Sequence, residues 1–311
     1  MAKNIALIGE CMLELTHQTG APGGRCLPMN LSYGGDTLNA AVYLARQGIA
    51  VDYVTALGDD PMSAWMTEQW RSEGVACGLI DYQADTVPGL YLIETDKQGE
   101  RSFYYWRESA PARRLLDDPV KAKHLFSQLE ERDWLCLSGI TLAIFSEAAR
   151  QRLYDALADY RRHGGRVAFD SNYRPKLWPS RESTREAYEA MYRLTDLALP
   201  TIEDEQLVFG DAEQSDIVDR LQSWGVSEIA LKMGEHGCLV VTDQDRELVA
   251  ANPVRVVDTT SAGDSFNAGY LAARLKGLSA ADAAAVGHRL ASVVIQHSGA
   301  IIPRDAMPKD P

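Results

Sequence analysis

Short runs of apolar residues recur along the chain and predict buried strands. The first, Asn4–Gly9, is almost wholly apolar up to its closing glycine, as in a strand buried on both faces. Residues 147–163 repeat apolar positions at helical spacing and end in a basic turn before Gly164 and Gly165, which predicts a helix. Further strand-like runs are residues 53–57, 134–138, 166–170, 197–200, 229–232 and 238–242. This alternation predicts a largely parallel sheet covered by helices.

Two stretches break the alternation. Residues 13–33 are rich in glycine and proline, and residues 87–108 contain two strand-like runs on either side of Thr95–Gly99, which predicts a β-hairpin. We expect one domain over residues 1–311, in which these two insertions form a small strand-rich lid over the ends of the core strands, where open α/β sheets bind ligands. An ordinary surface hairpin is the alternative.

Composition narrows the classes of function. The chain has 311 residues with 44 acidic and 31 basic side chains, a net charge of -13. This acidic excess disfavours broad binding to nucleic acids or anionic membranes. No apolar run approaches the roughly 20 residues that cross a bilayer, and no signal peptide is evident. The five cysteines are far apart and odd in number, which predicts reduced thiols and a cytoplasmic protein.

The strongest chemical signal is the segment 256–271, in which a strand end is followed by a turn of small residues and then by a helical run. Small residues let successive backbone N–H groups converge on an anion at a helix start. A carboxylate at Asp264 would be repelled by a bound phosphate, so its presence makes sense if it accepts a proton from an attacking hydroxyl. Capping of the helix by Asp264 is the alternative.

The string Asp258–Leu271 resembles the signature of the ribokinase-like (PfkB) carbohydrate kinases: Asp-Thr-x-small-Ala-Gly-Asp, then x3-Ala-Gly and two apolar residues. The resemblance implies a three-layer α/β/α core with a β-strand lid, a small-molecule sugar substrate, ATP and Mg2+, and a homo-oligomer. It also implies that Asp264 is the general base. The backbone of Ser261, Ala262 and Gly263 would form the catalytic anion hole. Ser261 stands where most members have glycine.

A second block gives the sugar side of the resemblance. In the family, a paired glycine and an asparagine hold the sugar hydroxyls, and the corresponding substrate-binding residues here are Gly34, Gly35, Asp36 and Asn39. The inner residues, Asp36 to Leu38, are larger than in many members. This departure concerns which sugar is bound rather than which reaction occurs. Two glycines alone would indicate only a turn.

A third block, Lys232–Gly237, matches the family's nucleotide-side hairpin, although glycines in a strand turn often only supply positive φ. The residues expected to contact ATP are Asn172, Lys232, Gly234, Gly237, Ser261, Gly263 and His288. The family's Asn-x-x-Glu motif falls at Thr201 and Asp204, where the asparagine is missing. Asp204 and Glu205 are candidates to bind Mg2+ through water, and a solvated helix start is the alternative.

The choice of sugar can be argued from charge. Residues 170–178 match a string that marks a subgroup including kinases of 2-keto-3-deoxygluconate and of fructose. An aldonic acid needs a fixed cation, and the planar fork of arginine suits a carboxylate. Tyr105 and Arg107 stand two residues apart on one face of a predicted strand, aimed with Tyr91 at one cavity if the lid covers the site. The resemblance adds Arg174 to this set.

The resemblance extends over residues 5–304 and implies ATP-dependent phosphorylation of 2-keto-3-deoxy-D-gluconate on its C6 hydroxyl, which gives 2-keto-3-deoxy-6-phosphogluconate. A fructokinase is the alternative within this class. A catalytically silent sugar- or nucleotide-binding regulator is the alternative outside it. For Tyr105 and Arg107, the alternative is a half-buried aromatic strand with a snorkelling arginine. A dinucleotide-binding dehydrogenase is disfavoured, because Gly9–Met12 lacks Gly-x-Gly-x-x-Gly.

Overall fold

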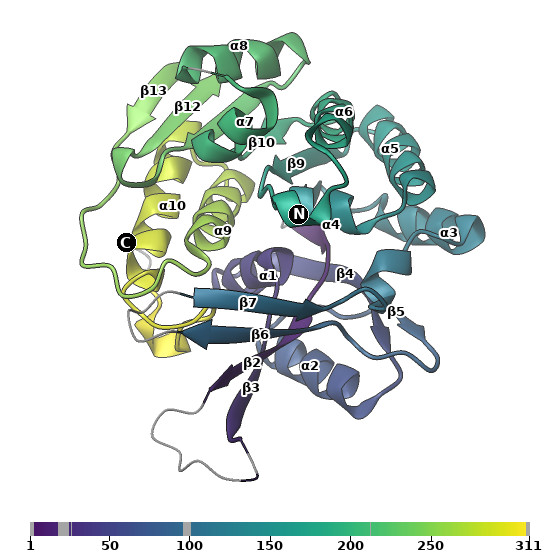
Figure 1. Cartoon of the computed structure of the whole chain (residues 1–311). Helices are drawn as coiled ribbons and strands as arrows, with labels where there is room; N and C mark the ends of the chain where they lie inside the picture. The colour runs from purple at the N-terminus through teal and green to yellow at the C-terminus, as the bar shows by residue number, and fades with distance from the viewer. Residues whose placement is uncertain (1–2, 18–24, 26, 96–100, 212, 309–311) are drawn as a thin grey trace.

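A large, mostly parallel sheet forms the centre of the computed structural model, which describes residues 3–17, 25, 27–95, 101–211 and 213–308 (Figure 1). Within those residues the sheet has nine strands, in the order β13 (Arg246–Val249), β12 (Cys238–Thr242), β11 (Glu228–Lys232), β10 (Leu197–Ala198), β9 (Arg166–Asp170), β8 (Trp134–Ser138), β1 (Asn4–Ile8), β4 (Ala50–Gly58) and β5 (Ile80–Gln83). From β11 to β5 all neighbours are parallel, and β12 and β13 extend one edge antiparallel.

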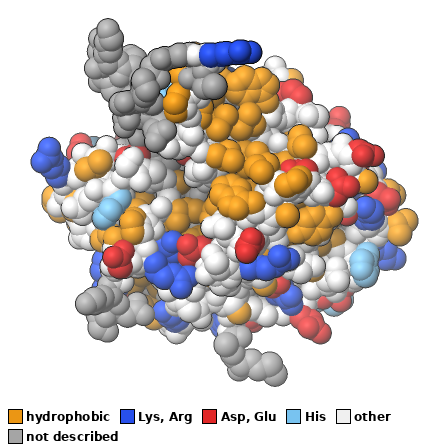
Figure 2. Space-filling model, turned by 90° about the horizontal axis from the view of Figure 1, so that it is seen from below, with side chains coloured by type: hydrophobic (Ala, Val, Ile, Leu, Met, Phe, Trp, Pro, Cys, Tyr) orange, Lys and Arg blue, Asp and Glu red, His pale blue; other side chains and the backbone are white. Residues whose placement is uncertain are grey.

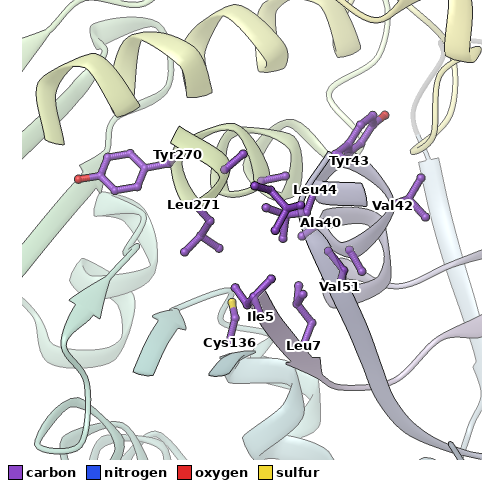
Figure 3. Close-up of a cluster of buried hydrophobic side chains, with 14 of the residues drawn as sticks. Ile5, Leu7, Ala40, Val42, Tyr43, Leu44, Val51, Cys136, Tyr270 and Leu271 are labelled. Carbon is purple, nitrogen blue, oxygen red and sulfur yellow. The ribbon is translucent and has the colours of Figure 1, made fainter. Parts of the chain in front are cut away.

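Helices cover both faces of this sheet, because successive side chains of a strand point to opposite faces. Ile5 and Leu7 of β1 belong to one hydrophobic core, and Ala6 and Ile8 belong to the other. Figure 3 shows the first core, where β1 and β4 pack against α1 and α9. Its helices are α1 (Asp36–Arg46), α2 (Pro61–Ser72), α9 (Ala262–Leu275) and α10 (Ala280–Val294). The second core holds α3 (Pro119–Leu129), α4 (Gly139–Ile144), α5 (Glu147–Arg162), α6 (Arg181–Tyr192), α7 (Ile202–Phe209) and α8 (Gln214–Ser223).

A second, smaller sheet lies beside the core and is called the lid sheet below (Figure 1). Its order is β3 (Met29–Gly34), β2 (Met12–His17), β6 (Leu90–Thr95) and β7 (Arg101–Trp106). β2 pairs in parallel with β6, so the two insertions meet in one sheet. The predicted three-layer α/β/α core with a β-strand lid is therefore confirmed. Of the expected turn at Thr95–Gly99, residues 96–99 lie outside the described residues.

The strands that the apolar pattern missed lie at sheet edges or in the lid. β13 and β5 are edge strands, and the side chains of β13 are largely exposed, so no apolar run marks them. Short 310 turns complete the secondary structure at Pro111–Arg114, Pro175–Leu177, Gly234–His236 and Arg304–Ala306. In the described part of the chain, no helix is both long and apolar enough to span a membrane.

Two glycines allow α9 and α10 to pack at backbone contact. A Cβ atom at Gly269 would lie 2.8 Å from the Cα of Gly287, closer than real side chains approach. A Cβ at Gly287 would in turn lie 2.8 Å from the ring of Phe266. Tyr270, in the same helix, donates to Glu228 at 2.7 Å and anchors α9 to β11. The helix that carries Asp264 is thus fixed from two sides.

Four cysteines, Cys11, Cys77, Cys136 and Cys238, are buried free thiols, as the sequence predicts. The fifth, Cys26, lies outside the described residues. Burial is the main cause that raises the pKa of the Cys136 and Cys238 thiols, so both are held in the neutral form.

Candidate active site

The candidate site lies where the core strands end and two helices begin. Asp170 ends β9 and Lys232 ends β11, while Asp36 begins α1 and Asp264 lies in the first turn of α9. Carboxyl ends of parallel strands meet at one edge of a sheet, which brings these residues together. The most direct link is a hydrogen bond of 2.8 Å from the Asn39 side chain to Asp264 Oδ2, which joins α1 to α9.

The environment of Asp264 favours its protonated form. Burial, followed by the charge of Asp36 and then that of Asp170, raises the pKa of Asp264 to about 7, against the opposing hydrogen bond from Asn39. A carboxylate in the first turn of a helix is normally stabilised as the anion. Here desolvation and like charges outweigh that effect. A base whose pKa lies near neutrality is well matched to accepting a proton from a hydroxyl.

The turn before Asp264 contains one residue in an unfavourable backbone conformation. Ser261 adopts φ 62°, in the left-handed region that glycine occupies more easily. The N–H of Ala262 donates to the Thr259 carbonyl at 3.2 Å, so it is already used within the turn. The first N–H groups of a helix have no intrahelical partner. Those of Gly263 and Asp264 are therefore the ones in position to meet an anion.

Lys232 lies beneath this turn rather than projecting from its hairpin. Its ammonium is 2.8 Å from Asp170 Oδ1 and donates to Asn267 Oδ1 at 3.0 Å, and the residue is only 8% exposed. A Cβ built at Gly263 would lie 3.8 Å from Lys232 Nζ. The cation therefore lies close to the turn that is expected to bind an anion. Its two partners, Asp170 and Asn267, lie in the motif strings 170–178 and 258–271 but were not expected to be site residues.

Asn172 joins the sugar side of the site. It has φ 29°, and its side chain donates to Asp36 Oδ2 at 2.6 Å, while the N–H of Thr37 donates to Asp36 Oδ1 at 2.8 Å. Burial raises the pKa of Asp36, and the charge of Asp170 adds to the effect. The amide expected near the nucleotide is thus hydrogen-bonded to a carboxylate of the sugar block.

The paired glycines allow close approaches. A Cβ at Gly34 would lie 2.4 Å from Tyr91 Oη of the lid sheet, and a Cβ at Gly35 would lie 2.2 Å from the backbone oxygen of Glu10. Neither position needs a positive φ, so the requirement for glycine here is spatial. The end of β3 can in this way lie against Tyr91 within the lid sheet, and the N-cap of α1 can lie against the chain that follows β1.

The lid residues lie on one face of their sheet. Tyr91 is paired across the sheet with Tyr105, and their ring centroids are 6.0 Å apart. The guanidinium of Arg107 lies 5.8 Å from the Tyr105 ring centroid. Arg107 is 6% exposed and forms an ion pair with Glu10, a residue that the sequence did not indicate. Tyr91 donates a hydrogen bond to Glu14, which also lies on this face.

The two carboxylates proposed for Mg2+ face different ways. Asp204 Oδ2 accepts from the hydroxyl of Ser171 at 2.9 Å and from the N–H of Tyr173 at 3.1 Å, and burial raises the pKa of Asp204. Glu205 points into the second core, where Tyr192 donates to one oxygen and Arg220 to the other. Glu205 is thus part of a structural ion pair.

Two of the expected nucleotide residues, His288 and Gly237, lie near one carbonyl at the end of β13. His288 Nε2 is 3.2 Å from the Val249 oxygen, and a Cβ at Gly237 would lie 2.3 Å from the same atom. Gly237 has φ 97° and Gly234 has φ 56°, so both turn positions favour glycine. Burial lowers the pKa of His288 and keeps its ring neutral. A neutral, partly apolar wall of this kind suits a base ring.

Arg174 is exposed and donates to the carbonyl of Tyr173 at 3.0 Å. It is close enough to Asp204 for its charge to oppose the rise of that pKa. In the described residues, no group of three or more His, Cys, Asp or Glu side chains is arranged to hold a metal ion. Mg2+ commonly binds through one or two carboxylates, waters and phosphates. Asp204, with one oxygen uncommitted to Ser171 or Tyr173, fits that mode.

Known proteins resemble this chain over nearly its whole length. The model of the pfkB family carbohydrate kinases matches residues 2–307. The 2-dehydro-3-deoxygluconokinase of Dickeya dadantii is 48% identical over 98% of this chain and 99% of its own. The enzyme of the same name from Escherichia coli K12 is 46% identical over 99% of this chain and 100% of its own.

The fold is shared more widely. A structure from Escherichia coli, assigned as ribokinase II and solved in complex with ATP and Mg2+, has a TM-score of 0.84 at 21% identity and covers 98% of this chain and 96% of its own. At that identity the likeness concerns the fold alone. The family match and the two end-to-end relatives go further and agree with the signature at Asp258–Leu271, so the chain belongs to the pfkB family of carbohydrate kinases.

Proposed function

We propose that the protein transfers the γ-phosphoryl group of ATP to the C6 hydroxyl of 2-keto-3-deoxy-D-gluconate (2-dehydro-3-deoxygluconate). The product is 2-keto-3-deoxy-6-phosphogluconate. The observation that carries this proposal is the 48% and 46% identity, over the full length, to two 2-dehydro-3-deoxygluconokinases. A carboxylate with a pKa of about 7 at an anion-binding turn supports the same reaction.

In the proposed reaction, the C6 hydroxyl gives its proton to Asp264 as its oxygen attacks the γ-phosphorus. The bond from that phosphorus to the β,γ-bridging oxygen breaks, and ADP leaves. Asn39 donates to Asp264 Oδ2, and we propose that the other oxygen, Oδ1, accepts the proton. The N–H of Gly263 and the cation of Lys232 stabilise the charge on the transferred group, since such catalysis is mostly positioning and electrostatics.

Mg2+, when bound with the nucleotide, would neutralise phosphate charge, and Asp204 is the carboxylate that we propose to hold its water. We propose that the adenine side of ATP contacts the hairpin at Gly234 and Gly237 and the wall at His288. Asn172 acts by orienting Asp36.

On the sugar side, we propose that the backbone at Gly34 and Gly35, with Asn39 and Asp36, binds the hydroxyls. The carboxylate of the substrate binds to Arg107, with Tyr105, Tyr91 and the exposed Arg174 around it. The alignment of Tyr91, Tyr105 and Arg107 on one face of the lid sheet supports this arrangement.

The decisive experiment is coupled ADP release with Mg-ATP against 2-keto-3-deoxygluconate, fructose and ribose in parallel. We expect kcat/KM to favour the acid by at least about tenfold, which corresponds to about 1.4 kcal/mol of differential transition-state binding. A preference for fructose would keep the kinase and remove the carboxylate site. The absence of turnover with every sugar would favour a regulator that binds without catalysis.

We also propose that two copies associate through the outward face of the lid sheet. Leu31, Tyr104 and Trp106 are 43%, 48% and 58% exposed on that face, and apolar patches of this kind mark protein interfaces. Figure 2 shows hydrophobic side chains gathered on the side of the molecule where the lid sheet and α2 lie. Light scattering should give a dimer that Trp106→Arg converts to a monomer. Val120→Arg, at an exposed position of α3, is the matched control and should leave the dimer intact.

A further inference from the structure

The ion pair between Glu10 and Arg107 joins the core to the lid sheet at the sugar side of the site. Glu10 follows β1 of the central sheet, and Arg107 follows β7, the last lid strand. The residues are 4% and 6% exposed, so the pair is buried. Glu10 also contacts the sugar block, since its backbone oxygen is the atom that a Cβ at Gly35 would meet.

The pairing is incomplete. Arg107 Nη2 contacts Glu10 Oε2, but Arg107 Nε and Glu10 Oε1 are both buried and have no hydrogen-bond partner within the described residues. Buried polar atoms are nearly always hydrogen-bonded, because an unpaired group has lost its water without compensation. Arg107 Nε is therefore a donor without a partner, which a polar atom of a ligand bound at Arg107 would satisfy.

Glu10 is in contact with the guanidinium of Arg107 before any substrate arrives. Burial raises the pKa of Glu10, and the charges of Arg107 and Arg113 oppose that rise. An ionised Glu10 compensates the guanidinium. A substrate carboxylate that approaches Arg107 then meets a negative charge already in contact with it, whereas a neutral sugar meets none.

We propose that Glu10 is an internal counter-ion with which the carboxylate of the substrate competes for Arg107, so that Glu10 sets how strongly the enzyme prefers an acid to a neutral sugar. This inference rests on the carboxylate site proposed above. It assigns Glu10 a role in specificity, exerted through Arg107, and no role in proton transfer. In the empty site Glu10 keeps the arginine in place, and in the complex it limits the affinity for the acid.

A purely structural ion pair predicts something different. If Glu10 only fastened the lid sheet to the core, its loss would weaken the fold and would affect acid and neutral substrates alike. Competition predicts opposite effects, namely a less stable empty protein and tighter binding of the acid. The two explanations therefore differ in whether the loss of Glu10 changes the binding of the acid alone or of acid and neutral substrates alike.

Glu10→Gln tests the proposal, because it keeps the shape and an acceptor but removes the charge. We expect KM for 2-keto-3-deoxygluconate to fall by about threefold or more, as for a like charge removed a few ångströms from a partly screened ligand. KM for fructose should not change. Thermal shift with the acid alone, without ATP, should show a larger rise in Tm for the variant than for the unaltered protein, independently of activity.

Two further variants serve as controls. Glu228 begins β11, at the end of the strand opposite to Lys232, and forms an ion pair with Arg274. Glu228→Gln breaks this pair and should lower Tm without changing the ratio of KM for the acid to KM for fructose. Glu10→Asp keeps the charge but withdraws it from Arg107. It should lower KM for the acid by less than Glu10→Gln does, and it serves if the glutamine variant does not fold.

The outcomes are distinct. A rise in KM for the acid in Glu10→Gln would overturn competition and make Glu10 a support that substrate binding requires. A fall in Tm with both KM values unchanged would leave only a structural ion pair and would also overturn the proposal. If Arg107→Ala leaves KM for the acid unchanged, the carboxylate site itself is wrong, whatever Glu10 does.

Discussion

Asp264 and Arg107 are both held by one partner from another part of the fold, yet their frameworks differ. Asp264 lies in a helix that packs on the central sheet and is bound by Asn39 of a second core helix. Arg107 lies at the end of a four-stranded sheet and is bound by Glu10 across the junction with the core. The proposed base is therefore positioned by buried elements of the core. The proposed recognition of the sugar would depend on the separate lid sheet.

This difference predicts that the core and the lid sheet control different properties of the enzyme. Changes near Asp264 should alter the rate of phosphoryl transfer for every sugar, and changes near Arg107 should alter which sugar is used. The same division would let related kinases change substrate by altering the lid sheet while the reacting groups stay in place.

The largest effect is expected from Asp264→Asn, which removes the base but keeps the shape. We expect kcat to fall by about 10²–10⁴-fold for every sugar. Because the pKa of Asp264 is raised from 3.8 to about 7 in the folded protein, the group destabilises the fold progressively as pH rises from about 4 to about 7. The full penalty remains at pH 8, so the variant should also have a higher Tm there. Turnover near that of the unaltered enzyme, measured by ADP release, would remove Asp264 as the base.

Arg107→Ala should have a smaller and more selective effect. Loss of a charged hydrogen bond costs about 1.5–3 kcal/mol, so kcat/KM for the acid should fall by roughly tenfold to a hundredfold. The fall should appear in KM for the acid, with KM for ATP little changed. An equal loss of kcat/KM with fructose would mean that Arg107 does not select the acid, and that the regions around Asp264 and Arg107 do not act separately.

The pH dependence tests the electrostatics around the base. Asp264 must be ionised to accept a proton, so kcat/KM should fall as pH decreases through about 7, approaching about tenfold per pH unit. Asp36→Asn removes a charge that raises this pKa and should move the fall to lower pH. Since ATP also titrates, the control is the difference between the two proteins under identical conditions. An unmoved profile would assign the fall to another group.

The smallest effect concerns the turn at Ser261. A non-glycine residue in the left-handed region costs about 1 kcal/mol, so Ser261→Gly should stabilise the protein by up to that amount and raise Tm by about 2 °C. Calorimetry measures this directly. A lower Tm would show that the serine hydroxyl contributes more than the strain removes.

The apolar pattern predicted the core strands because each is buried on both faces, as Ile5 to Ile8 are. It missed β13, whose exposed edge position needs no apolar run. The turn of small residues and Asp264 were predicted because they are contiguous in sequence. Glu10 was missed because a single acidic residue after a strand carries no signal, and its partner is 97 residues away. Asp204 and Glu205 are adjacent in sequence, but neighbouring residues of a helix point in different directions. Their side chains in α7 therefore meet different partners.

The contact between Gly269 and Gly287 changes how the family signature should be understood. The Ala-Gly pair near the end of the motif has no reacting group, but a side chain at Gly269 would press on the backbone of α10. That pressure would push α9 outward and carry Asp264 with it. This part of the signature therefore specifies the spacing between two helix axes, and a search with the motif selects for that spacing as well as for the base.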